Sequence, residues 1–361
     1  MSVEPVGGPE GGGRRLGASL AFDLAVGAVL FVGVTIGFSP WYSDRLLDRG
    51  AFRAYYGHGV YQFRILGPEV VLWLDRVVPN DPLGSHLVVN GRHPHAADLF
   101  TALFVLNAVS FVAVLLLARG IVRRAGVAEP GRSLVMALLL VVVAVSLSTV
   151  TPYDLPSVAF ILGILVAASA RPPWDLLAVL LVVAGVLTRE SALVAVAALV
   201  AHALVVPPSR RRVVVTAVTG AAGVAAYLGV RIGASSPSFW EAVTAAGNVA
   251  RLIQWIGLGV MAAAYLAWRH ACALAGLDGP VVRRSLVWLW LLASPYVVTA
   301  LMTGYWFEVR LLVPMLACEL WLRGAVARQH DTESFQSSRP LPGLLTSRSR
   351  PSTVTSPTGS S

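Results

Sequence analysis

The sequence predicts an all-α protein, a polytopic transmembrane helix bundle, and three observations support this prediction. The chain has 361 residues, of which 56% are hydrophobic and 13% are charged, whereas soluble domains carry about 25% charged residues. Its mean hydropathy is +0.70. Apolar runs that match one membrane crossing in length recur along most of the chain. These features exclude a soluble globular domain and indicate one membrane domain.

The apolar runs predict about ten membrane spans, because a helix needs about 20 apolar residues to cross a bilayer. The first run follows two arginines and is too long for the apolar region of a signal peptide, so we interpret it as an uncleaved span. The spans are expected at residues 18–38, 98–118, 133–150, 155–170, 174–187, 191–206, 213–233, 249–268, 285–304 and 311–327.

One apolar run, residues 176–206, is too long for a single span and carries charge in its middle. As one helix it would measure about 47 Å, against a hydrocarbon core of about 30 Å. We therefore expect a tight hairpin that turns at residues 188–190 and exposes this turn on the outer side. The hairpin also agrees with the positive-inside rule. It places Arg210, Arg211, Arg212, Arg269, Arg283 and Arg284 inside, and only Arg231, Arg251 and Arg310 near outer ends.

With this topology the protein is a multi-pass protein of a cell membrane, and both of its termini are cytoplasmic. The sequence divides into a cytoplasmic N-terminus at 1–17, a transmembrane domain at 18–327 that includes an outer loop at 39–97, and a disordered cytoplasmic tail at 328–361, rich in Ser, Thr and Pro. The outer loop should hold two short interfacial helices. One carries Leu47, Ala51, Phe52, Tyr55 and Tyr56 on a single side, and the other begins near Pro68.

The net charge is +9, and all 28 basic residues that contribute to it are arginines, because the chain contains no lysine. Arginine collects in the cytoplasmic loops of membrane proteins, so the charge predicts no nucleic-acid partner. The two cysteines form no metal motif. His86, His93 and His95 with Asp98 match no zinc spacing, so no metal site is expected, although a divalent cation is left open as a cofactor.

Charged and aromatic residues collect where separate segments reach the outer side. Since the spans pack as a bundle, we expect these residues to line one outward-facing cavity. The alternative for each residue alone is that it anchors its span at the interface. Arg189 and Glu190 are expected to pair with each other or with neighbours, as buried charges must. The expected cavity residues are Arg64, Tyr153, Asp154, Arg189, Glu190, Glu308 and Arg310.

Five short motifs carry a family resemblance that covers most of residues 18–327. They are FSPWYSDRLLD just after the first span, and then YQFRILGP, TPYDLPS, LTRESAL and EVRLLVP. Through them the chain resembles the GT-C glycosyltransferase superfamily, and more narrowly a branch of bacterial membrane proteins of that architecture. GT-C enzymes use polyprenyl-phosphate-linked sugars and carry an acidic catalytic residue early in a long first outer loop. The resemblance therefore implies catalytic roles for Asp44 and Asp48. In contrast to the acidic residues that stand close together in many GT-C enzymes, these two stand four apart, and each precedes an arginine.

The first functional interpretation is transfer of a sugar from a polyprenyl-phosphate-linked donor to an acceptor at the outer face. Asp44 or Asp48 would act as the general base on the acceptor hydroxyl. Arg64, Arg189 and Arg310 would hold the lipid phosphate, because a guanidinium matches phosphate in a bidentate way. The residues expected to orient these arginines are Glu190 and Glu308, and those expected to line the sugar site are Tyr153 and Asp154.

The second interpretation is a non-enzymatic membrane transporter or lipid-binding protein, since ionisable residues in spans also mark substrate pathways. A transporter needs polar groups that open to both sides of the membrane. The sequence indicates no second polar cluster near the cytoplasmic side or the midplane. This expectation favours the enzyme over the transporter.

Overall fold

The computed structural model describes most of the chain and contains only helices and their connections in that part. The all-α class that the sequence predicts is therefore confirmed for the described residues. The structure describes residues 10–37, 46–57, 59–78, 83–84, 98–147, 151–232, 245–304 and 309–337.

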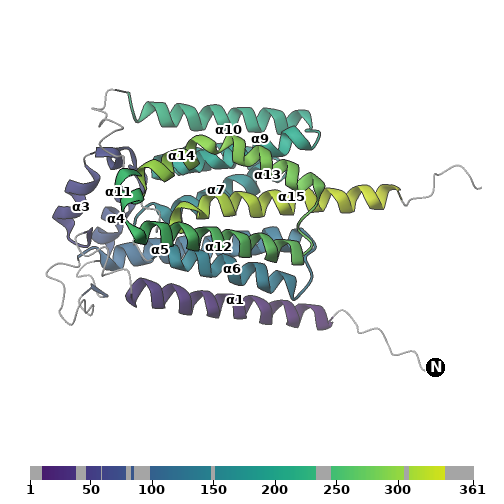
Figure 1. Ribbon diagram of the computed structural model, residues 1–361, viewed down its shortest axis with the longest axis horizontal. Helices are drawn as coiled ribbons and strands as arrows, with labels where there is room; N and C mark the ends of the chain where they lie inside the picture. The colour runs from purple at the N-terminus through teal and green to yellow at the C-terminus, as the bar shows by residue number, and fades with distance from the viewer. Residues whose placement is uncertain are drawn as a thin grey trace, which may run out of the picture.

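The long helices lie side by side and run back and forth between two ends of the bundle (Figure 1). They overlap the apolar segments of the sequence, and α13 and α14 form a pair that is bent by 54°. Their bounds are α1 (Glu10–Gly37), α5 (Phe100–Arg124), α6 (Gly131–Ser146), α7 (Asp154–Ser169), α8 (Trp174–Thr188), α9 (Leu193–Val205), α10 (Arg210–Gly229), α12 (Leu252–Leu274), α13 (Pro280–Leu292), α14 (Ser294–Thr303) and α15 (Val313–Ser337).

Four helices in the described part are long and apolar enough to cross a membrane. They are α1 over Ser19–Gly37, α5, α10 and α12, and the pair α13 and α14, bent by 54°, would be a fifth. The helices α6, α7, α8 and α9 are apolar but shorter. The structure thus supports a helical membrane protein with several candidate spans. Helix α15 continues to Ser337, beyond residue 327 where the sequence placed the end of the last span.

Helix α7 lies in the middle of the bundle and packs against α5, α8 and α15 (Figure 1). The core around it is built from aliphatic side chains that are shielded almost completely, such as Leu139, Ile161, Leu165, Val182 and Leu316. Burial of such side chains is consistent with a tightly packed bundle interior. The outer helices α1, α10 and α12 expose most of their apolar residues, as helices that face lipid do.

The two ends of the bundle differ. Two short helices, α3 (Arg49–Tyr56) and α4 (Leu66–Val77), lie at one end together with α11 (Ala245–Ala250), and we call it the loop-helix end (Figure 1). Helix α1 begins and α15 finishes at the opposite end, which we call the terminal end (Figure 1). The first and last described helices therefore have their free ends on the same side of the bundle.

The short helices α3 and α4 confirm the two helices that the sequence places in the loop 39–97. Asp48 caps α3, since its carboxylate Oδ1 accepts a 2.6 Å hydrogen bond from the N–H of Ala51. Leu47, Phe52 and Tyr56 are buried, as the sequence pattern indicates, whereas Tyr55 of the same predicted side is 41% exposed. They pack in a small core with Val71 of α4, and with Leu99, Phe100 and Leu103 at the start of α5.

Helix α4 approaches the chain before α7 closely, and a glycine makes this possible. A Cβ atom on Gly67 would lie 2.2 Å from the carbonyl oxygen of Pro152, well inside van der Waals contact. Only glycine fits where a backbone approaches so closely. The contact fixes the segment before α4, which carries Arg64, beside the segment that begins α7.

The long apolar run folds as the expected hairpin. Helix α8 ends at Thr188, a 3₁₀ turn covers Glu190–Ala192, and α9 begins at Leu193. Arg189 takes an extended conformation (φ −163°, ψ 135°), which interrupts the helix. The expectation of an exposed turn at 188–190 is wrong for Thr188 and Arg189, because both are buried. Helix α4 packs against α8, and the 3₁₀ turn (η4) packs against α7. These two contacts cover this part of the hairpin turn.

A buried ion pair that the sequence analysis did not anticipate joins α1 to α5. Arg119 of α5 donates to the carboxylate of Asp23 in α1, and both side chains are shielded from solvent. Buried charges are expensive unless they are paired. The pair therefore attaches the peripheral helix α1 to the bundle.

We expect the Asp23→Ala variant to lose about 3–5 kcal/mol of stability, because Arg119 would stay buried without its carboxylate. Thermal unfolding in detergent measures this loss. The double variant Asp23→Leu/Arg119→Met removes both charges and should unfold closer to the wild-type temperature. A double variant less stable than the single one would contradict the role given to the pair.

Candidate functional site

Charged and aromatic side chains from several segments meet at the loop-helix end of the bundle. The segments are α3, η2 (Gly59–Phe63) with the residues after it, the start of α7, the turn between α8 and α9, and η6 (Val309–Leu311). We call this set the arginine–tyrosine cluster, and it consists of Tyr55, Tyr61, Arg64, Tyr153, Asp154, Arg189, Glu190 and Arg310.

Asp154 is the centre of the ion pairs. Its carboxylate is paired with Arg189 and, at 2.7 Å through Oδ2, with Nη1 of Arg310. The hydroxyl of Thr151 also donates to Oδ2, at 2.6 Å. The side chain is only 8% exposed. Asp154 is the first residue of α7, where the helix dipole stabilises a negative charge.

Arg64 forms the second pair, with Glu190. Its Nη2 and Nε atoms donate to the two carboxylate oxygens at 2.9 and 3.3 Å, which is the bidentate geometry of strong arginine–carboxylate pairs. The guanidinium carbon of Arg64 also lies 4.3 Å from the ring centre of Tyr153. Burial alone would lower the pKa of Arg64, but the charge of Glu190, its hydrogen bond and the neighbouring tyrosines together raise the pKa, so Arg64 stays protonated.

The tyrosine rings stack beside these arginines. The Tyr55 and Tyr61 ring centres are 4.6 Å apart, and the rings of Tyr61 and Tyr153 are nearly parallel, with their centres 6.2 Å apart. Burial raises the pKa of Tyr55 and of Tyr56, so their hydroxyls stay neutral at physiological pH. Tyr55 is 41% exposed, so the stack reaches the molecular surface. Aromatic faces and guanidinium groups therefore lie together at this end.

The structure decides between the two pairings that the sequence left open for Arg189 and Glu190. Arg189 and Glu190 do not pair with each other, because Arg189 bonds Asp154 and Glu190 bonds Arg64. The extended backbone at Arg189 explains this arrangement, since successive side chains of an extended segment point to opposite sides. The turn therefore links two different partners, α7 and the segment before α4.

The described cluster carries more positive than negative charge. Three guanidinium groups (Arg64, Arg189 and Arg310) and two carboxylates (Asp154 and Glu190) leave a net charge of +1. Glu190 is the most accessible of the paired groups, with 37% of its side chain exposed. An arginine-rich site of this kind is suited to binding an anion such as a phosphate.

The sequence-predicted site residues are thus brought together only in part. Arg64, Tyr153, Asp154, Arg189, Glu190 and Arg310 form the cluster, whereas Asp44 and Glu308 lie outside the described residues. Asp48 is described, and its carboxylate caps α3. Among the described residues no group of His, Cys, Asp and Glu has metal-binding geometry, and His86, His93 and His95 lie outside them.

A second polar cluster lies nearer the terminal end, which contradicts the expectation that none exists there. Glu319 and Arg323 of α15 are both fully buried. Glu319 Oε1 accepts 2.9 Å hydrogen bonds from the Tyr265 hydroxyl and from Trp290 Nε1. Arg323 lies 3.4 Å from Glu319 and from Asp278. A glutamate and an arginine four residues apart in the last apolar segment were the sequence signal for this pair.

Comparison of the chain with models of protein families, with curated proteins and with solved structures found no match. The geometry of the cluster therefore carries the functional argument.

We expect Asp154→Asn to cost more stability than Glu190→Gln, because it leaves two buried guanidinium groups without their anion. The expected losses are about 3–5 kcal/mol for Asp154→Asn and about 1 kcal/mol for the more solvated Glu190→Gln. The control is Asp75→Asn, which removes a 2.8 Å pair with the exposed Arg49 and should cost less than about 1 kcal/mol. Thermal unfolding in detergent ranks the three, and a larger loss for Glu190→Gln would refute the central role of Asp154.

Proposed function

We propose that the protein is a multi-pass membrane protein in which ten helical passes cross the bilayer. The loop-helix end faces outward, and both termini are cytoplasmic. The distribution of arginine supports this orientation, since positive residues accumulate on the cytoplasmic side. The terminal end carries Arg123, Arg124, Arg132, Arg171, Arg210, Arg211, Arg212, Arg269, Arg283 and Arg284 at or beside helix ends.

Cysteine labelling from outside the cell tests this orientation. Ala54 of α3 and Pro208 before α10 are both exposed and belong to opposite ends of the bundle. A membrane-impermeant maleimide should label Ala54→Cys in intact cells, and Pro208→Cys only after the membrane is opened. The wild type gives the blank, because Cys272 and Cys318 are buried. Labelling of Pro208→Cys in intact cells, with Ala54→Cys protected, would reverse the proposed topology.

The proposed activity is transfer of a sugar from a polyprenyl-phosphate-linked donor to an acceptor at the outer face. The observation that carries it is the convergence of three guanidinium groups, with one excess positive charge, beside stacked tyrosines at one end of an apolar helix bundle. Such a donor combines a lipid tail, a phosphate and a sugar. A bundle in the bilayer, arginines at its surface and flat aromatic faces match these three parts in turn.

In the proposed reaction the acceptor hydroxyl attacks the anomeric carbon of the donor sugar. The bond from this carbon to the phosphate oxygen breaks, and the polyprenyl phosphate leaves with its electron pair. Arg64, Arg189 and Arg310 stabilise the charge on the departing phosphate. Asp44 takes the proton of the acceptor hydroxyl as general base. We prefer Asp44 to Asp48 because the Asp48 carboxylate already caps α3.

The alternative is a transporter or lipid-binding protein without catalysis, and the buried pair of Glu319 and Arg323 favours it. Buried ionisable residues in membrane helices often belong to substrate pathways. The chain between the two clusters argues against a pathway, because Val313, Met315 and Leu316 of α15 are all buried in the apolar core. A continuous polar route would require these residues to separate from their neighbours, so the enzyme remains the first proposal.

The variants Asp44→Asn and Asp48→Asn distinguish the two aspartates. We expect Asp44→Asn to lower sugar transfer by about a hundredfold or more, the contribution of a general base. Asp48→Asn should stay near wild type, because asparagine also caps helices well. Transfer from a panel of polyprenyl-phosphate-linked sugars, or the glycan profile of the cell envelope, measures this difference. Transfer that survives Asp44→Asn but not Asp48→Asn would move the base to Asp48, and survival in both variants would remove it from this loop.

A further inference from the structure

Two grooves open between helices of the bundle, and both have arginines near the terminal end. The first lies between α12 and α13, has a volume of about 480 Å³, and is lined by Tyr265, Arg269, Arg283, Leu286, Val287, Trp290 and Leu291. The second lies between α8 and α10, has a volume of about 530 Å³, and is lined by Asp175, Leu176, Val179, Arg210, Arg211, Val214, Val215 and Val218.

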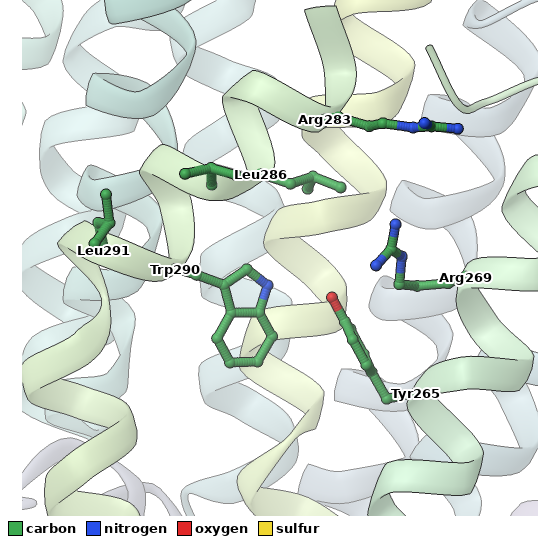
Figure 2. Close-up of a pocket in the computed structure, with 7 residues that line it drawn as sticks. Tyr265, Arg269, Arg283, Leu286, Trp290 and Leu291 are labelled. Atoms are coloured by element: carbon green, nitrogen blue, oxygen red, sulfur yellow. The ribbon is translucent and has the colours of Figure 1, made fainter. Parts of the chain in front are cut away.

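In the first groove the charged and apolar parts are separated along the helix axes. Arg269 lies one helical turn before the end of α12, and Arg283 lies one turn after the start of α13. Figure 2 shows both arginine side chains on one side of the groove, with Tyr265 and Trp290 further along it. The remaining lining residues from α13 are aliphatic. A lipid whose headgroup lies at the arginines would therefore place its acyl chain in an apolar channel.

The net charge of this groove remains positive after its ion pairs are counted. Arg283 lies 3.2 Å from Asp278, which also accepts from the buried Arg323. Arg269 is exposed and has no ion pair within the described part of the chain. The hydroxyl of Tyr265 and the indole N–H of Trp290 both donate inward to Glu319. Both polar groups are thus satisfied by the interior and leave the groove wall apolar.

The walls of the groove belong to candidate membrane spans. Helix α12 is a candidate span, and α13 belongs to the bent pair that forms another. Leu291 is 57% and Val287 58% exposed. Apolar side chains with this exposure on a spanning helix contact acyl chains rather than water. A soluble anion would leave the aliphatic part of the groove unfilled, whereas a phospholipid fills both parts.

We propose that the groove between α12 and α13 binds an anionic phospholipid from the leaflet at the terminal end. Its headgroup phosphate pairs with Arg269 and Arg283, and one acyl chain lies along Leu286, Val287 and Leu291. Basic pockets between membrane helices on the cytoplasmic side are suited to anionic headgroups. The site is separate from the arginine–tyrosine cluster, and it does not depend on sugar transfer. It requires only that α12 and α13 lie in a membrane.

Native mass spectrometry of the full chain, released from nanodiscs of equal phosphatidylglycerol and phosphatidylcholine, tests the proposal. The wild type should retain phosphatidylglycerol in preference to phosphatidylcholine. The variant Arg269→Gln/Arg283→Gln should lower this preference by about 25-fold, or about fivefold for each arginine. The matched control is Arg171→Gln/Arg284→Gln, which removes the same charge from exposed residues that line neither groove. This control should stay within about twofold of the wild type.

A further variant that keeps every charge distinguishes loss of the groove from misfolding of the protein. Leu291→Trp narrows the groove at an exposed position and should also lower phosphatidylglycerol retention, with an unchanged elution profile in size exclusion. Equal retention of the two lipids by the wild type would overturn the proposal. Equal losses in the groove and control variants would overturn it as well, because they indicate general attraction to the arginines of this end. Thermal stabilisation by glycerol phosphate that matches the effect of the lipid would assign the arginines to a soluble anion instead.

Discussion

Two guanidinium groups, from Arg189 and Arg310, share the buried carboxylate of Asp154, and the loop-helix end is organised around this contact. In a medium of low dielectric an unpaired charge is expensive, so each of these side chains restricts where the others can lie. Asp154 begins the central helix α7, Arg189 follows the end of α8, and Arg310 precedes α15. One carboxylate therefore fixes the relative positions of two consecutive helices, α7 and α8, and of α15, which is distant in the sequence.

The pair of Arg64 and Glu190 extends this arrangement to the loop helices. Because Glu190 follows Arg189 directly, the same turn that contacts α7 also holds the segment before α4. The close approach of Gly67 to Pro152 adds a backbone contact that admits no side chain. The motifs YQFRILGP, TPYDLPS and LTRESAL, and the VRLL part of EVRLLVP, thus meet in one place. Their polar residues hold the fold together and also form the surface that we propose binds a lipid-linked phosphate.

The opposite end of the molecule has a different character. There the arginines lie at helix ends and at the mouths of grooves with aliphatic walls, whereas the buried pair of Glu319 and Arg323 is enclosed by α12, α13 and α15. The loop-helix end combines paired arginines with stacked tyrosine rings, and the terminal end combines exposed arginines with apolar channels. This asymmetry fits a protein that meets different headgroups in the two leaflets of one membrane.

The sequence by itself determined the all-helical class, the break near residue 189 and the two short helices of the first loop, because each depends on local features: apolar run length, charge within a run and capping residues. It did not indicate the bend between α13 and α14, which it treated as one span at 285–304. It also indicated the members of the cluster, since they interrupt apolar segments. Only the tertiary structure decided the pairing. Arg64 and Glu190 are 126 positions apart, and Asp23 and Arg119 are 96 apart. Such pairs depend on how helices are rotated and placed against each other, which no local pattern encodes. For the same reason the sequence did not show that Thr188 and Ser191 are buried, or that Glu319 and Arg323 have partners on neighbouring helices.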